Sequence, residues 1–207
     1  MSHGQALGPG EGIIRKVGRP RGMASFRAFI AIDLAPMPGL DAFLNELSRV
    51  KGLKPVDPRN LHVTLKFLGS VDEALVPRIG EVMRASCEGI PPFQVEAQGS
   101  GVFPPKGSAR VVWADLKGAE PMATMATRLE KAMEPLGFAP EGRGFRPHLT
   151  LARVKDQSAS SPARAIASSY QSSFFGKKTV AEVLLKSSVL RPQGPEYSTV
   201  LNVPLPG

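Results

Sequence analysis

Two stretches of the sequence share one pattern, and they read Asn60-Leu-His-Val-Thr-Leu-Lys-Phe-Leu-Gly69 and Phe145-Arg-Pro-His-Leu-Thr-Leu-Ala-Arg-Val154. Each contains His-x-Thr followed directly by Leu, and the two histidines are 86 positions apart. Side chains at i and i+2 of a β-strand share a face, so each His points the same way as its Thr, with apolar residues in the core behind them. The motifs use two of the three histidines in the chain, so any account of function has to explain this pair.

The composition is that of a basic globular protein. The chain has 207 residues, of which 42% are hydrophobic and 21% charged, which suits one domain or two small lobes sharing a core. A formal net charge of +8 favours a polyanionic partner. No apolar run approaches the roughly 18 residues of a membrane span, so no membrane partner is expected.

The first 22 residues differ in composition from the rest. Residues 1–22 are rich in Gly and Pro, carry four Lys or Arg against one Glu, and contain no secretory apolar core. We expect a disordered arm, a tag or an upstream extension there, with Met23 as an alternative start and 23–207 as a single bilobal domain. His3 lies in this arm and receives no role.

Cys87 is the only cysteine of the chain, so an internal disulfide is impossible and a cytoplasmic location is expected. No motif surrounds this thiol. We therefore expect Cys87 to be a small residue of the core.

Hydrophobic periodicity predicts strands alternating with helices. The expected strands cover 26–34, 60–69, 93–97, 110–116, 145–154, 179–190 and 197–204, and the expected helices cover 39–50, 73–87, 120–136 and 163–171. Each half of the chain then offers a strand, a helix, further strands and one His-x-Thr-Leu. This order indicates an α+β protein of two related lobes, whose motif strands face each other across a central cleft.

Two facing histidines can give and take a proton in one turnover, which suits in-line displacement at phosphorus. The hydroxyls of Thr64 and Thr150, aimed the same way as the rings, would hold the non-bridging phosphate oxygens. Arg153 lies five residues after His148, an odd offset that points away from the histidine in an ideal strand. Strand twist, a β-bulge or the strand's end would have to bring it back.

The histidines also admit other interpretations. A single His-x-Thr is more often structural, but two identical copies favour function. A zinc site would need a third and usually a fourth ligand, and outside the arm no further histidine exists. The sequence also contains neither a phosphate-binding Gly-x-x-x-x-Gly-Lys-Ser/Thr loop nor a Gly-x-Ser-x-Gly elbow.

Taken together, the two motifs resemble those of the two-histidine phosphoesterases, and among these the RNA 2′,3′-cyclic phosphodiesterases, often labelled 2′-5′ RNA ligases. Further similar segments occur at 27–34, 110–113 and 194–197, whereas residues 1–22 lie outside the resemblance. The resemblance implies two pseudo-symmetric lobes of antiparallel sheet with helices packed outside. It also implies metal-independent hydrolysis of a terminal 2′,3′-cyclic phosphate on RNA to a 2′-phosphate, without a cofactor, and reverse 2′-5′ ligation.

The same resemblance implies roles for single residues. His62 would be the proton donor and His148 the proton acceptor, with Thr64 and Thr150 on the phosphate. The residues expected to bind the substrate are Arg153, Arg27, Phe29 and Arg146, although packing in the core explains Phe29 equally well. The expected partner is RNA with a cyclic phosphate end, tRNA halves being one candidate, and the expected state is a monomer.

Basic residues gather in sequence around the motifs and would attract an RNA backbone, while Phe103 could stack on bases. They are Lys54, Arg59, Lys66, Lys106, Arg110, Arg143 and Arg146. Two alternatives stay open: an RNA- or tRNA-binding module with incidental catalysis, and a cyclic phosphodiesterase for small nucleotides. The first predicts that His62→Ala leaves RNA affinity intact, and the second predicts that mononucleotides react as fast as oligonucleotides.

Overall fold

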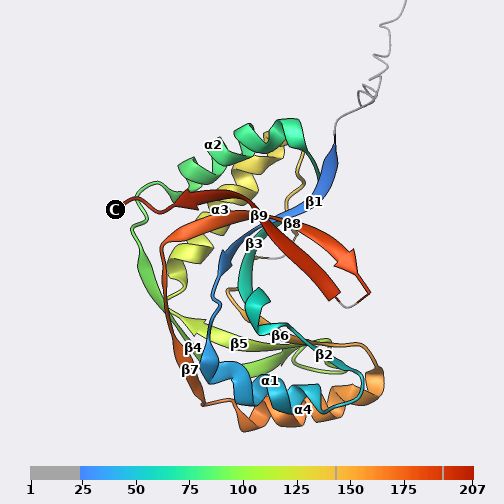
Figure 1. The fold of residues 1–207 in the computed structure, drawn as a ribbon. Coiled ribbons are helices and arrows are strands. Elements are labelled where there is room, and N and C mark those ends of the chain that lie inside the picture. The colour runs from blue at the N-terminus through green and yellow to red at the C-terminus, as the bar shows by residue number, and fades with distance from the viewer. Residues whose placement is uncertain (1–23, 143, 193) are drawn as a thin grey trace, which may run out of the picture.

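Two antiparallel sheets organise the part of the chain that the computed structural model describes, residues 24–142, 144–192 and 194–207 (Figure 1). The expected arm at 1–22, the alternative start at Met23 and Arg143 lie outside the described residues. The first sheet has the order β3-β1-β8-β9, with strands at His62–Asp72, Ser25–Asp33, Glu182–Arg191 and Gly194–Pro204. The second has the order β2-β6-β5-β4-β7, with strands at Leu53–Pro55, Leu149–Val154, Val111–Lys117, Phe93–Phe103 and Phe174–Val180.

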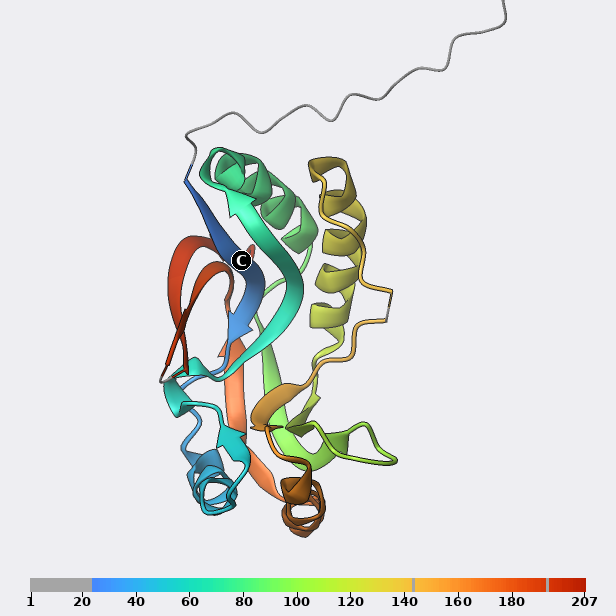
Figure 2. The ribbon, with the colours of Figure 1, turned by 90° about the vertical axis from the view of Figure 1, so that its right-hand side faces the viewer.

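The α-helices of the described chain lie in pairs on the outside of the two sheets (Figures 1 and 2). They are α1 (Asp41–Ser48), α2 (Val76–Cys87), α3 (Glu120–Met133) and α4 (Ser160–Ser169). The neighbouring helices α2 and α3 contact β9 and β3 of the first sheet, whereas α1 and α4 contact strands of the second. The predicted α+β architecture, with sheet lobes and outer helices, is confirmed.

The two lobes are not the two halves of the chain, which corrects the expectation drawn from the sequence repeat. The C-terminal strand β8 pairs with β1, and β9 pairs with β8, so the last strands complete the sheet of the first motif. Likewise α1, from the first third of the chain, covers the second sheet. Strand pairing depends on which edges meet and which faces can be buried, so strands far apart along the chain can be neighbours in one sheet.

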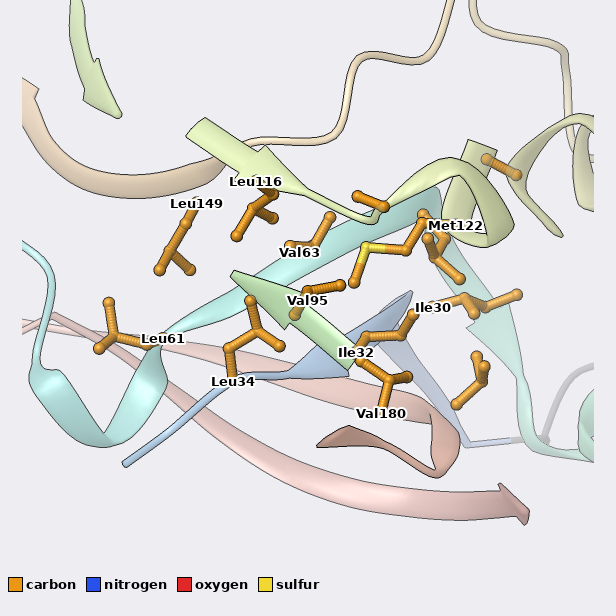
Figure 3. Close-up of a cluster of buried hydrophobic side chains, with 14 of the residues drawn as sticks. Ile30, Ile32, Leu34, Leu61, Val63, Val95, Leu116, Met122, Leu149 and Val180 are labelled. Carbon is orange, nitrogen blue, oxygen red and sulfur yellow. The ribbon is translucent and has the colours of Figure 1, made fainter. Parts of the chain in front are cut away.

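Buried side chains from both sheets belong to one continuous core. Figure 3 shows Ile30, Ile32 and Val63 of the first sheet close to Val95 and Leu149 of the second. One face of α3 belongs to the core as well, since Met122, Met125, Leu129 and Met133 are buried. The thiol of Cys87 is also buried and donates to the sulfur of Met125, and burial raises the pKa of this thiol to about 11.

Two helix ends show standard capping. The carboxylate of Asp72 accepts from the backbone N–H of Ala74 ahead of α2, and Gly137 ends the turn after α3 with φ of 87°.

Several strand boundaries differ from the prediction. β4 continues beyond the expected end at residue 97 as far as Phe103, because a bulge after Ala97 accommodates Gly99 within the strand. The expected strand at 179–190 is two strands, β7 and β8, which belong to different sheets. The three-residue β2 has no sequence pattern of its own and exists because it pairs with β6.

Candidate active site

The same local hydrogen bond holds each motif histidine. His62 begins β3, and its Nδ1 lies 2.5 Å from the carbonyl oxygen of Asn60. His148 directly precedes β6, and its Nδ1 lies 2.8 Å from the carbonyl oxygen of Arg146. A carbonyl oxygen only accepts hydrogen bonds, so Nδ1 carries the proton in both rings. This leaves Nε2 of each imidazole as the nitrogen that can exchange a proton with a substrate.

Each motif strand also contains a β-bulge at the leucine that follows its threonine. Along β1, Ile30 pairs with Lys66 and Ala31 with Thr64, so Leu65 has no partner. Along β5, Val112 pairs with Ala152 and Trp113 with Thr150, which leaves Leu151 without a partner. A bulge shifts the alternation of side chains by one residue, so the fifth residue after each histidine returns to the histidine face. A bulge of the kind needed to bring Arg153 onto the histidine face is therefore present.

The two motif strands are brought together although they belong to different sheets. β3 and β6 lie in direct contact. Burial lowers the pKa of His62 and raises that of Tyr197, and at both rings the positive charge of Arg153 acts to lower the pKa. The guanidinium on the second motif strand is thus close enough to act on the histidine of the first. Thr64 and Thr150 are half-buried on the same two strands.

Aromatic rings pack behind His62. The ring centroid of Phe29 lies 5.2 Å from His62 and 5.0 Å from Tyr197, and the centroids of His62 and Tyr197 are 5.3 Å apart. Phe29 is only 4% exposed, so it supports the histidine and offers little surface to a nucleotide.

His148 has a comparable support. Phe103 meets it edge-on at 5.2 Å and stacks on Trp113 at 5.1 Å. Part of the Phe103 surface that was expected to stack on bases is therefore used within the protein.

An ion pair lies beside His62. Asp33 is the cross-strand partner of His62. Nζ of Lys186 lies 2.5 Å from Oδ2 of Asp33. Burial is the main cause that lowers the pKa of His62; the Asn60 carbonyl and Asp33 oppose it, and Lys186 and Arg153 reinforce it. These surroundings therefore favour the uncharged form of His62 in the free protein.

Sequence reasoning missed Asp33, Lys186 and Tyr197 as site residues. In the sequence, Lys186 stands out because it is a lone lysine that directly follows the apolar residues 183–185.

Comparison with known proteins agrees with this geometry. The protein-family model described as the 2′-5′ RNA ligase superfamily matches residues 36–185 of this chain. The chain belongs to this superfamily. A relative named RNA 2′,3′-cyclic phosphodiesterase from Archaeoglobus fulgidus is 38% identical over 173 residues, covering 83% of this chain and 96% of the relative. One of the same name from Methanothermobacter thermautotrophicus is 36% identical over 180 residues, covering 83% and 95%.

Solved structures show the same superfamily fold. A Thermus thermophilus crystal structure is 30% identical with a TM-score of 0.72, covering 86% of this chain and 97% of its own. E. coli LigT complexed with 3′-AMP has a TM-score of 0.65 at 21% identity, covering 88% and 99%, a likeness that concerns the fold alone. The resemblance drawn from the two motifs is confirmed at the level of the superfamily.

Among the basic residues expected to surround the motifs and attract RNA, one is placed differently from the prediction. Lys66 is fully buried, because the bulge at Leu65 turns it away from the histidine face, so it cannot belong to this group. Arg59 forms an ion pair with Asp57. Lys54 is the cross-strand neighbour of Arg153 and is exposed with it. The remaining described members are also exposed, as is Arg27: Lys106, Arg110 and Arg146.

Other features of the described chain lie away from the motifs. A cavity of about 450 Å³ between the end of α2 and residues 204–206, and another of about 280 Å³ beside Trp113, contain no motif residue in their lining. Among residues 24–142, 144–192 and 194–207, no three His, Cys, Asp or Glu side chains are grouped to hold a metal ion. Within the same residues, no helix has the length and apolarity needed to cross a membrane.

Proposed function

We propose that this protein hydrolyses a terminal 2′,3′-cyclic phosphate on RNA to a 2′-phosphate. The observation that carries the proposal is the matched pair of histidines, each tethered through Nδ1 and each with Nε2 left for proton transfer. Their strands touch, and Arg153 lies within electrostatic reach of His62. The names of the relatives from Archaeoglobus and Methanothermobacter support the same reaction.

In the proposed reaction, Nε2 of His148 takes a proton from water as its oxygen attacks phosphorus. The bond from phosphorus to the ribose O3′ breaks, and His62 gives the proton on its Nε2 to that oxygen. The product keeps the phosphate on O2′, and the two rings then exchange protons with solvent to restore their starting states. Such paired transfer avoids a free hydroxide and a free alkoxide.

The groups around the histidines suit an anionic transition state. The hydroxyls of Thr64 and Thr150 would donate to the non-bridging oxygens, and Arg153 would pair with the phosphate charge, with Lys54 beside it. Arg27 and Arg146 would contact the RNA backbone farther out. On the other motif strand, Phe67 is 59% exposed and lies 6.3 Å from Phe29 between ring centroids. We assign it to the base of the terminal nucleotide.

The donor role of His62 requires a change on binding, because burial holds its pKa below the ordinary value in the free protein. A phosphodiester carries a negative charge, and an opposite charge within a few ångströms favours the protonated imidazole. Substrate binding would therefore charge His62 for its role as acid. Neither a metal ion nor a cofactor takes part in these steps.

Finer features of the function are also proposed. The RNA end would come from cleaved transcripts such as tRNA halves, and the protein would act as a cytoplasmic monomer. Run in reverse, the same groups would join a cyclic phosphate end to a 5′-hydroxyl as a 2′-5′ linkage.

The test is to incubate the protein in EDTA with an oligoribonucleotide ending in a 2′,3′-cyclic phosphate and to identify the phosphate isomer formed. A 2′-phosphate is expected. Retained RNA binding without hydrolysis would refute the proposal in favour of a binding module. A 3′-phosphate product would refute the assignment of the leaving oxygen. A nucleoside 2′,3′-cyclic phosphate that reacts as fast as the oligonucleotide would overturn RNA as the substrate.

A further inference from the structure

Lys66 belongs to the first motif strand but not to its reaction face. Its side chain is 0% exposed, and its Nζ lies 2.8 Å from Glu130 Oε2 and 3.1 Å from the carbonyl oxygen of Ala139. A buried ammonium is costly unless it is paired and hydrogen-bonded, and these two acceptors meet that need. The contacts join β3 to α3 and to the segment that follows α3.

A second set of bonds runs between the same elements. Glu130 Oε2 also accepts from the backbone N–H of Glu141, at 2.9 Å. The side chain of Glu141 in turn accepts from the backbone N–H of Phe67, at 3.3 Å, on the outer edge of the first sheet. Residues 137–142, which we call the return segment, are thus held at Ala139 and Glu141 onto the strand that starts at His62.

The return segment leads directly to the second motif. In Figure 2 the ribbon after α3 turns back alongside this helix and then runs down to β6. Glu141 is only seven positions before His148. The strand of the first histidine therefore holds the chain at Glu141, seven positions before the second histidine.

We propose that Lys66 and Glu130 form a positioning pair that sets the second motif relative to the first. Its catalytic consequence rests on the proposed function, because acid and base must stand on opposite sides of one phosphorus atom. Small displacements of reacting groups by distant changes are known to cost up to about 10²-fold in rate. The placement itself does not depend on the reaction.

Three variants separate positioning from stability. Lys66→Met removes both bonds of the ammonium. The double variant Lys66→Met/Glu130→Leu also removes the carboxylate, so that no buried charge is left unpaired and folding is retained. Lys66→Arg keeps donors for both acceptors. Lys177→Met is the control, since Lys177 forms a Lys–Glu pair with Glu96 at 2.6 Å within the second sheet.

The first measurement is hydrogen exchange and NMR without substrate. In Lys66→Met and in the double variant, the amides of Phe67 and Glu141 should exchange at least about 10-fold faster, and the ring signals of His148 should move. In Lys177→Met neither should change. Unchanged exchange and unchanged His148 signals in a folded double variant would overturn the inference.

The second measurement is turnover of the cyclic phosphate. We expect kcat to fall about 10- to 100-fold in the double variant with a smaller change in KM, and Lys66→Arg to recover most of the loss. A double variant with normal kcat would show that the pair is merely structural. If the wild-type protein hydrolysed no cyclic phosphate, the proposed function would fail, and the exchange data would still decide the placement.

Discussion

At the start of β3 and directly before β6, a histidine is bound through Nδ1 to the carbonyl two residues earlier, and a threonine and a bulged leucine follow it in the strand. In each strand the bulge returns the fifth residue after the histidine to the outside. That residue is Phe67 in β3 and Arg153 in β6. The backbone is therefore the same on both sides, and the difference lies in what this matched position offers: an aromatic surface on one strand and a cation on the other.

The residue just before it also differs. Lys66 in β3 is turned into the protein, where it binds Glu130, whereas Ala152 in β6 is simply buried. Under the proposed function, the repeated scaffold would support divided tasks: β6 would carry charge toward the phosphate, and β3 would carry the base-facing ring and hold the approach to the other strand. The predictions below test this division.

The largest effect is expected where the two strands are alike. His62→Ala and His148→Ala should each lose at least about 10²-fold in kcat, the usual contribution of a positioned acid or base. Steady-state hydrolysis of the cyclic phosphate measures this. Thermal unfolding of each variant serves as the control, because neither ring is part of the apolar core. Near-normal turnover by either folded variant would rule out paired catalysis.

Arg153→Met tests the charged side of the comparison. A charge-assisted hydrogen bond contributes about 1.5–3 kcal/mol, so kcat/KM should fall roughly 10- to 100-fold. Arg84→Met, which changes an exposed arginine on α2, should leave kcat/KM unchanged. If the two variants behaved alike, Arg153 would be an ordinary surface residue and the asymmetry of the two strands would carry no chemistry.

Sequence periodicity predicted the shared features of the two strands better than their differences. The alternation of His, Thr and Leu placed His62 with Thr64 and His148 with Thr150, because that pattern depends only on local strand geometry. Lys66 was expected among the basic residues that attract RNA, and this was wrong because the bulge at Leu65 turns its side chain into the protein. A bulged leucine leaves no mark in the sequence, since either face of the strand accepts an apolar residue there.

Features that depend on distant segments were beyond the reach of the sequence. Asp33 meets Lys186 only because β8 pairs with β1, and the short β2 forms only because β6 offers an edge. From the sequence, Arg153 needed a bulge, a twist or a strand end to reach the histidine face, and the structure contains the bulge. Local pattern therefore predicted the histidines and threonines of the candidate site, and strand pairing determined their surroundings.

Phe67→Ala tests the aromatic side. Stacking of a base on an aromatic ring contributes about 1–3 kcal/mol, so KM for a cyclic-phosphate oligonucleotide should rise roughly 10-fold with little change in kcat. Phe174→Ala is a matched control, because Phe174 is 55% exposed on β7 of the other sheet. Ribose 2′,3′-cyclic phosphate, which has no base, should react equally with Phe67→Ala and wild type. An equal loss on that substrate would contradict base stacking.

The smallest effects concern the pKa of His62, which NMR titration of the ring can follow. Asp33→Asn removes a carboxylate that acts to raise this pKa and leaves Lys186 unneutralised, so the pKa should fall further below its ordinary value. Arg153→Met removes a cation that acts to lower the pKa of His62, so in that variant this pKa should rise.

The same two variants identify which histidine is the acid. An acid must be protonated, so activity is lost as the pH rises through its pKa, and kcat/KM reports this for the free protein. If His62 is the donor, the alkaline limb of kcat/KM should move to lower pH in Asp33→Asn and to higher pH in Arg153→Met. Should the acidic limb move instead, His62 is the base and the roles of the two strands are exchanged.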